Sequence, residues 1–175
     1  MILGFILALS ISLQEELRPY IENICEQYSI APTLVEAMIE VESSWDPEAI
    51  NGTCTGLMQI STKWHMERAK NLGVTDLLDP KGNILVGIDY LGELFNRYED
   101  VGLVLDKYNG NLKAWDYYEQ GELSPYAKKV TELSAELEKE REKENEEVKK
   151  EVTNDTLRNN GRLIKTLGNG RGHRR

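Results

Sequence analysis

The stretch from Leu34 to Ile60 constrains the fold most, because its helical part carries an acidic residue among apolar ones. On a helical wheel the apolar side chains fill one broad arc, which holds Leu34, Val35, Ala37, Met38, Ile39 and Val41. Glu36 and Glu40 fall on the opposite, polar arc, whereas Glu42 falls within the apolar one. Burial raises the pKa of a carboxyl group, and a carboxyl that stays protonated at neutral pH is a general acid. In the alternative interpretation, the helix frays by residue 42 and Glu42 is a solvated last-turn residue.

The segment after Glu42 favours the buried interpretation, because it can fold back toward the end of the helix. Asp46-Pro47 predicts the end of the helix, since the residue before a proline is disfavoured in the α region. A polar loop follows, in which a small hairpin fits between Asn51 and Thr55. It leads to the apolar run from Gly56 to Ile60, which carries one amide, Gln59. A loop that folds back places Gln59 near the helix of Glu42.

Four motifs follow one another along the chain. The first is Glu42-Ser43-Ser44-Trp45-Asp46-Pro47-Glu48-Ala49 with Gly56-Leu57-Met58-Gln59-Ile60 after the loop. The others are Asp79-Pro80 with Asn83, Gly87 and Tyr90-Leu91, then Tyr108-Asn109, then Tyr126 with Val130. Together, over about residues 18 to 134, they resemble the soluble lytic transglycosylases, which have a lysozyme-like domain. The chain departs from that family's pattern in having Lys107 where a small residue is usual, and Gly110-Asn111 where Ala-Gly is usual.

The resemblance implies a function and a set of site residues. Glu42 is the expected catalytic residue, and the expected substrate-binding residues are Ser43, Met58, Gln59, Tyr108, Asn109 and Tyr126. We expect no metal and no cofactor. The expected substrate is the glycan strand of peptidoglycan, cleaved between N-acetylmuramic acid and N-acetylglucosamine to leave a 1,6-anhydromuramyl end. For the hydroxyl of Tyr108, either the Glu42 carboxyl or a backbone group can be the partner that a buried tyrosine needs.

Two other functions compete with this one. A hydrolytic lysozyme on the same scaffold needs a second acid or a positioned water, and Asp46 is the nearest candidate in sequence. A non-catalytic module that binds the cell wall needs only the fold. Against the second alternative, the chain has Glu42, Gln59 and Tyr108 all together.

Charge and rare residues exclude several other classes of function. The formal net charge is -9, which argues against a nucleic-acid-binding domain. The only histidines are His65 and His173, so a histidine-based metal site or a Ser-His-Asp triad has little material. The two cysteines, Cys25 and Cys54, could form one bridge, although we expect two free thiols.

We expect four segments along the 175 residues. Residues 1–14 are apolar and suit a signal-peptide core or membrane anchor, with an N-terminal helix of the fold as the alternative. Residues 15–137 form the lysozyme-like domain, 138–152 an exposed charged helix, and 153–175 a disordered basic tail. The apolar segment or the tail could contact a membrane or the wall. We therefore expect a monomer that acts outside the cytoplasm, at the wall or membrane, or on a virion if a phage encodes it.

The expected fold is mostly α, with helices around a substrate groove. Pro19 should start the first domain helix, Ser61 or Thr62 should cap a helix that runs to Leu72, and Asp79 should cap another. Further helices are expected over 103–108 and from Ser124-Pro125 onward. On the Asp79 helix, Asp89 and Glu93 are expected to be solvated. For Trp64 we expect core packing, with a platform for a sugar ring as the alternative.

Overall fold

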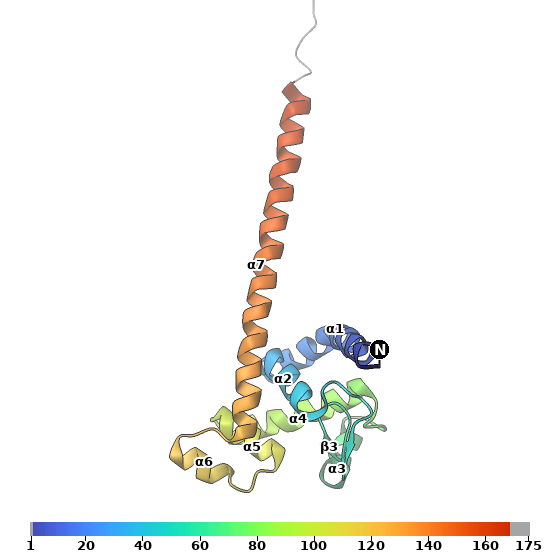
Figure 1. Ribbon diagram of the computed structural model, residues 1–175, viewed down its shortest axis with the longest axis vertical. Helices are drawn as coiled ribbons and strands as arrows, with labels where there is room; N and C mark the ends of the chain where they lie inside the picture. The colour runs from blue at the N-terminus through green and yellow to red at the C-terminus, as the bar shows by residue number, and fades with distance from the viewer. Residues whose placement is uncertain (1, 169–175) are drawn as a thin grey trace, which may run out of the picture. The chain divides into compact units, whose positions relative to one another are not determined.

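The computed structural model describes the backbone of residues 2–168 and the side-chain surroundings of residues 13–150. By its internal contacts the chain divides into two units, Met1–Ala135 and Glu136–Arg175. Figure 1 shows that helices dominate the described part. The expected mostly α fold is confirmed.

Seven helices and three short strands make up the described residues. The helices are α1 (Ile2–Tyr28), α2 (Pro32–Ser43), α3 (Thr62–Asn71), α4 (Pro80–Arg97), α5 (Val101–Asn109), α6 (Ala114–Gln120) and α7 (Pro125–Gly168). The strands β1 (Ile50–Asn51), β2 (Cys54–Thr55) and β3 (Ile60–Ser61) form an antiparallel sheet in the order β1-β2-β3. The predicted hairpin is therefore present as β1 and β2. The sequence did not predict β3 or α6.

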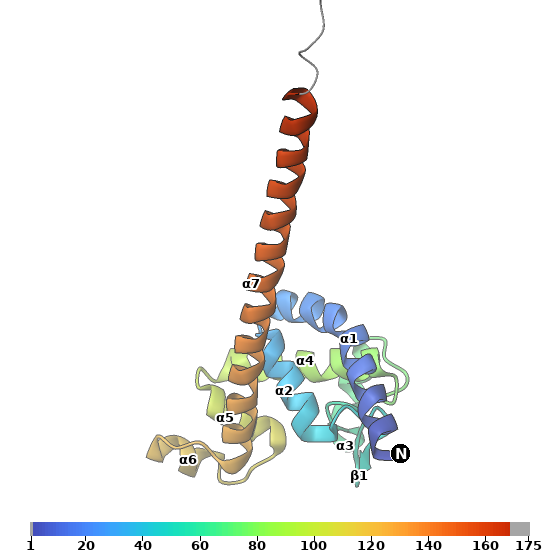
Figure 2. The same ribbon diagram turned by 45° about the horizontal axis from the view of Figure 1, so that its top comes forward.

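Helix α4 organises the first unit. It contacts α1, α3, α5 and β3, and Figure 1 and Figure 2 both show it running through the middle of the unit. Its N-terminus is the predicted one: Asp79 is the N-cap, and its carboxylate accepts a 2.7 Å hydrogen bond from the Gly82 N–H. Ile84, Ile88 and Leu91 share one fully buried face of the helix, and Val86, on the opposite face, is fully buried as well. This apolar face holds the helices around the sheet.

Asn83 of α4 fixes the loop that follows β2. Its buried amide accepts a 2.7 Å hydrogen bond from the Met58 N–H and donates to the carbonyls of Thr55 (2.9 Å) and Leu77 (2.8 Å). Gly56 lies against this amide with φ +74°, and a Cβ there would lie 2.3 Å from Asn83 Nδ2. Only glycine fits at residue 56, for both its backbone angle and its close contact.

Two predictions for the N-terminal region are wrong. Pro19 lies inside α1 and does not start it, and Figure 2 shows α1 changing direction along its length, as a proline that lacks the N–H donor makes a helix do. Glu36, expected on the polar arc, is fully buried, and its Oε1 lies 3.7 Å from Nε of Arg18. The polar arc of α2 is covered here because α1 packs against it. Glu40 is exposed, as predicted.

The acidic residues of α4 are also not simply solvated. Arg68 of α3 makes ion pairs with both Asp89 and Glu93, and the Tyr28 hydroxyl donates a 2.7 Å hydrogen bond to Asp89. The sequence could not show this, because the partners come from two other helices. Burial, with the hydrogen bond to Asp89, raises the pKa of Tyr28 to about 12.

Both ends of the described backbone are helical. Residues 2–14 form the first turns of α1, and among the described residues no helix is long and apolar enough to span a bilayer. Helix α7 continues to Gly168, whereas disorder was expected from Thr153. Residues 169–175 of the basic tail lie outside the described part. Cys25 and Cys54 are both free thiols.

Candidate active site

A cavity of about 630 Å³ opens beside the end of α2. Five parts of the first unit line it: the end of α2, the small sheet, and α3, α4 and α5. The lining residues are Glu42, Asn51, Thr53, Cys54, Gln59, Ile60, Ser61, Trp64, His65, Tyr90, Lys107, Tyr108, Asn109 and Gly110.

The backbone around Glu42 is well defined. Helix α2 ends at Ser43, and the N–H of its C-cap residue Ser44 bonds to the carbonyl of Glu40. Ser44 and Trp45 have φ values of 52° and 62°, so the chain turns sharply, and the buried Trp45 ring anchors the turn. Glu42 thus lies in an intact last turn, and the frayed alternative does not apply.

The Glu42 carboxyl is held by two side chains from distant helices. The Tyr126 hydroxyl donates a 2.6 Å hydrogen bond to Glu42 Oε1, and the Asn109 side chain makes a second hydrogen bond. Burial raises the pKa of Glu42, and the two hydrogen bonds favour its charged form without cancelling that rise. The pKa of Tyr126 is raised as well, by burial first and then by the neighbouring Glu42 carboxylate. Tyr126 therefore stays a hydrogen-bond donor.

Tyr108 does not bind the Glu42 carboxyl. Its hydroxyl donates a 3.0 Å hydrogen bond to the carbonyl of Met58, which is the backbone alternative considered above. Burial, followed by the charge of Glu42, raises the pKa of Tyr108. The Tyr108 ring is 5.3 Å from that of Tyr90, which is 4.3 Å from the His65 ring, measured between centroids. These three rings form an aromatic wall of the cavity.

Gln59 lines the cavity and also fixes its rim. It has a φ of 47°, and its amide Nε2 donates to the carbonyls of Ala49 (3.1 Å) and Gly56 (2.9 Å). These bonds fold the loop between β1 and β3 back toward α2, as the sequence predicted.

The other expected substrate-binding residues lie in different places. Asn109 lines the cavity beside Glu42, and Tyr126 reaches it through its hydrogen bond with Glu42. Ser43 is outside the lining, and its hydroxyl donates to the carbonyl of Ile39. Met58 is fully buried and packs on Gly87, where a Cβ would lie 2.4 Å from the Met58 sulfur. Direct contact of Ser43 or Met58 with substrate stays a prediction.

Trp64 is a lining residue that sequence reasoning placed wrongly. Its side chain is 72% exposed and lines the cavity, so the expectation of core packing is wrong. It also borders a neighbouring cavity of about 540 Å³, which reaches Arg68 and Asp89. The first turn of α3 lies at the edge of the small sheet, and no feature of the sequence distinguishes that exposed position from a buried one.

Within the described lining, Glu42 is the only Asp or Glu. Asp46 is exposed, and its carboxylate accepts a 2.9 Å hydrogen bond from the Glu48 N–H. Asp106 is buried away from the lining and accepts a hydrogen bond from the Ser124 hydroxyl. Among the described residues no group of three or more His, Cys, Asp or Glu side chains is placed to hold a metal ion. Glu42 is thus the one carboxyl group that the described lining supplies.

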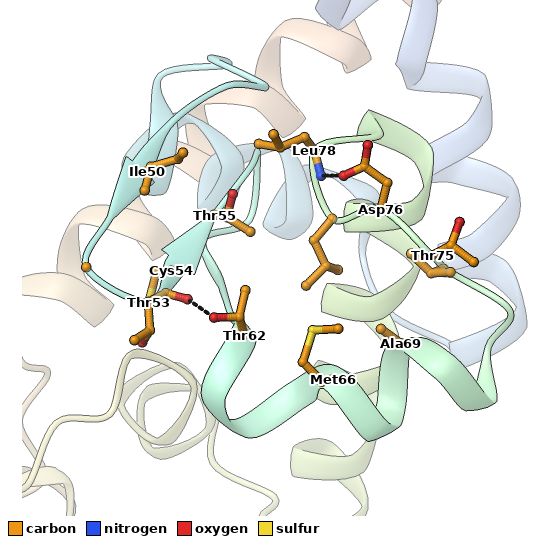
Figure 3. A pocket seen from close by; sticks show the side chains of 13 residues that line it. Ile50, Thr53, Cys54, Thr55, Thr62, Met66, Ala69, Thr75, Asp76 and Leu78 are labelled. Atoms are coloured by element: carbon orange, nitrogen blue, oxygen red, sulfur yellow. Dashed lines mark hydrogen bonds between the residues drawn. The ribbon is translucent and has the colours of Figure 1, made fainter.

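A second cavity, of about 340 Å³, lies between the sheet, α3 and the segment before α4. Figure 3 shows the side chains of Met66, Ala69 and Leu78 around it. Its one acidic residue, Asp76, uses its carboxylate to accept a 2.8 Å hydrogen bond from the Leu78 N–H. The cavity is thus mainly apolar and offers no acid directed at a ligand.

Residues 19–124 match the family model of the transglycosylase SLT domain, and the chain belongs to that family. It is 40% identical over 85 residues to the transglycosylase of Enterobacteria phage PRD1, covering 48% of this chain and 31% of that protein. It is 35% identical, also over 85 residues, to the membrane-bound lytic murein transglycosylase F of Desulfosudis oleivorans, covering 48% of this chain and 18% of that protein. The chain therefore spans less than a third of the length of these relatives.

The fold is similar to a solved structure of the same kind. An inactive mutant of the lytic transglycosylase Slt from Pseudomonas aeruginosa superposes with a TM-score of 0.57 at 19% identity, over 67% of this chain and 23% of that one. At that identity the likeness concerns the fold.

Proposed function

We propose that the protein is a peptidoglycan lytic transglycosylase. It cleaves the β-1,4 bond between N-acetylmuramic acid and N-acetylglucosamine and leaves a 1,6-anhydromuramyl end. The observation that carries this proposal is the single carboxyl of Glu42 in the described lining, with a raised pKa and a fixed geometry. The family of the chain and its lytic murein relatives support it.

In the first step Glu42 acts as a general acid. Burial raises the pKa of its carboxyl and so favours the protonated form, whose proton passes to the glycosidic oxygen as the bond to the leaving sugar breaks. Tyr126 and Asn109 hold the carboxyl in place and stabilise the carboxylate that results. The substrate's own N-acetyl group stabilises the positive charge at the anomeric carbon.

In the second step the Glu42 carboxylate acts as the base. It takes the proton from the C6 hydroxyl of the muramyl residue, whose oxygen bonds to the anomeric carbon. The atoms balance without water, and Glu42 is protonated again for the next turnover. The cycle needs no cofactor, and no second protein carboxylate.

The hydrolytic alternative needs groups that the described lining lacks. A retaining hydrolase uses a second carboxylate about 5–5.5 Å from the acid, and an inverting one uses a base about 6.5–9.5 Å away. Asp46, the candidate from sequence, is exposed and engaged with the Glu48 backbone. A module that only binds the wall would not require the Tyr126–Glu42 bond.

The place of action follows from the substrate. Peptidoglycan lies outside the cytoplasm, so we infer extracytoplasmic action at the cell wall, as a monomer. Two kinds of relative support this inference, one from a phage and one described as membrane-bound.

Digestion of purified peptidoglycan in ¹⁸O-water tests the chemistry. Lytic cleavage gives muramyl-ended fragments that carry no ¹⁸O, because the C6 oxygen is the nucleophile. They weigh about 20 Da less than fragments hydrolysed in ¹⁸O-water, the mass of one H₂¹⁸O. Incorporation of ¹⁸O at most new ends would show a lysozyme. A parallel digestion of the same peptidoglycan with the Glu42→Gln protein identifies chain ends that do not come from this site.

A further inference from the structure

Lys107 is a basic residue in the lining of the Glu42 cavity, and its ammonium lies over the ring of Trp115, which is outside that lining. It lies in the last turn of α5, directly before Tyr108 and Asn109, and it lines the same cavity. In the described lining it is the only Lys or Arg. Its ammonium lies 5.1 Å from the ring centroid of Trp115, and among the described residues it has no ion-pair partner.

The charge of this cavity contrasts with that of the chain. The chain carries a net charge of -9, whereas the described lining holds one lysine and one carboxyl. That carboxyl, on Glu42, has a raised pKa, and the pKa of the other titratable base, His65, is lowered by burial and by Arg68. Lys107 is therefore the one lysine or arginine of the described lining that can meet an anionic group of a substrate.

A purely structural role explains only part of this placement. A cation in the last turn of a helix interacts favourably with the free carbonyls there, and Lys107 can do so for α5. That effect needs a base in the last turn, but it does not need one that lines the cavity.

We propose that Lys107 binds a carboxylate on the glycan strand and makes the enzyme prefer acidic strands. The carboxylate belongs to the 3-O-lactyl group of a muramyl residue, either free or extended by a peptide with its own carboxylates. The proposal rests on the function proposed above and names the substrate feature that this site selects. An ammonium–carboxylate contact that is partly exposed contributes a modest factor, and salt screens it.

The test is a binding measurement that does not depend on turnover. Calorimetric titrations compare Glu42→Gln with the double variant Glu42→Gln, Lys107→Met. The ligands are peptide-free glycan oligomers with free lactyl carboxylates, the same oligomers with these groups converted to methylamides, and peptide-bearing oligomers. Lys113→Met in the Glu42→Gln background is the matched control, because Lys113 is exposed and outside the cavity.

We expect Glu42→Gln to bind an acidic oligomer about two- to fivefold more tightly than the methylamide at low salt, and to lose this preference as salt is added. The Lys107→Met change should abolish the preference, Lys107→Arg should keep most of it, and Lys113→Met should leave it intact. If the peptide-free acidic oligomer binds more tightly than its methylamide, the lactyl carboxylate is the group that Lys107 binds. If only the peptide-bearing oligomers gain affinity from Lys107, the carboxylates of the peptide are the groups that it binds. An equal preference with and without the lysine overturns the proposal.

Cleavage by the unmodified protein is measured separately. Binding through Lys107 without cleavage refutes the proposed function, whereas cleavage that does not depend on Lys107 refutes this inference alone.

Discussion

The hydroxyl of Tyr126 donates a 2.6 Å hydrogen bond to Oε1 of Glu42, and so joins residues 84 positions apart in the chain. The contact connects the last turn of α2 with the first turn of α7. Because Tyr126 keeps its proton, it stabilises the charged form of Glu42, while burial stabilises the neutral form. These two opposing effects, burial and the hydrogen bond from Tyr126, together set the pKa of Glu42.

Glu42→Gln should keep the fold and lose nearly all glycan cleavage, because an amide cannot deliver a proton. Loss of a positioned general acid costs about 10²- to 10⁴-fold in rate. The matched control is Glu40→Gln, since Glu40 is exposed on the same helix. The measurement is the rate of release of soluble fragments from peptidoglycan. Normal turnover by a folded Glu42→Gln protein would show that another residue is the acid.

Tyr126→Phe should move the alkaline limb of the pH–activity profile to higher pH. The change removes a hydrogen bond that lowers the Glu42 pKa, so the carboxyl stays protonated further up the pH scale. The measurement is kcat/KM as a function of pH, which reports the groups of the free enzyme. If the kcat/KM of Tyr126→Phe falls at the same pH as that of the unmodified protein, or at a lower pH, the alkaline limb does not report the ionisation of Glu42.

Glu42 should also make stability depend on pH. Its folded-state pKa is raised, so its contribution to stability is present below the unfolded carboxyl pKa and is lost as pH rises through the folded value. The Glu42→Gln protein lacks this term, and it should gain stability relative to the unmodified chain as pH rises over that window. Urea unfolding at a series of pH values measures the difference. Parallel stability curves would mean that the Glu42 pKa is not raised.

Asn83→Ala should destabilise the first unit by about 3 kcal/mol, because it leaves three buried backbone groups without their partners. Asn96→Ala is the control on the same helix, since Asn96 is exposed, and its effect should stay within about 0.5 kcal/mol. Urea denaturation measures both. Similar midpoints for the two variants would contradict the role assigned to the Asn83 amide.

A chain that ends at Glu140 should fold and cleave soluble glycan fragments as the full chain does. The first unit ends at Ala135 by its internal contacts, and the buried residues of α7 lie before that point. Thermal unfolding and fragment release are the two measurements. A markedly lower Tm for the shorter chain would show that residues after 140 contribute to folding.

Local patterns in the sequence were enough to place several elements. Asp79-Pro80 marked the N-terminus of α4, and the apolar spacing behind it marked the buried face. Glu42 was identified because it breaks the helical pattern, and its partial burial agrees with that. These predictions succeed because capping, proline geometry and helical period act between residues that are close in the chain.

The tertiary structure alone decided which polar groups meet. Glu36 and Glu40 look alike on a helical wheel, yet only Glu36 is covered, because α1 packs on that part of α2. The partner of Glu42 is Tyr126 and not Tyr108, because α7 brings its hydroxyl to the carboxyl while Tyr108 bonds to the Met58 carbonyl. Burial and hydrogen bonding of a side chain depend on elements far away in sequence, and these are the terms that set the pKa of an acid.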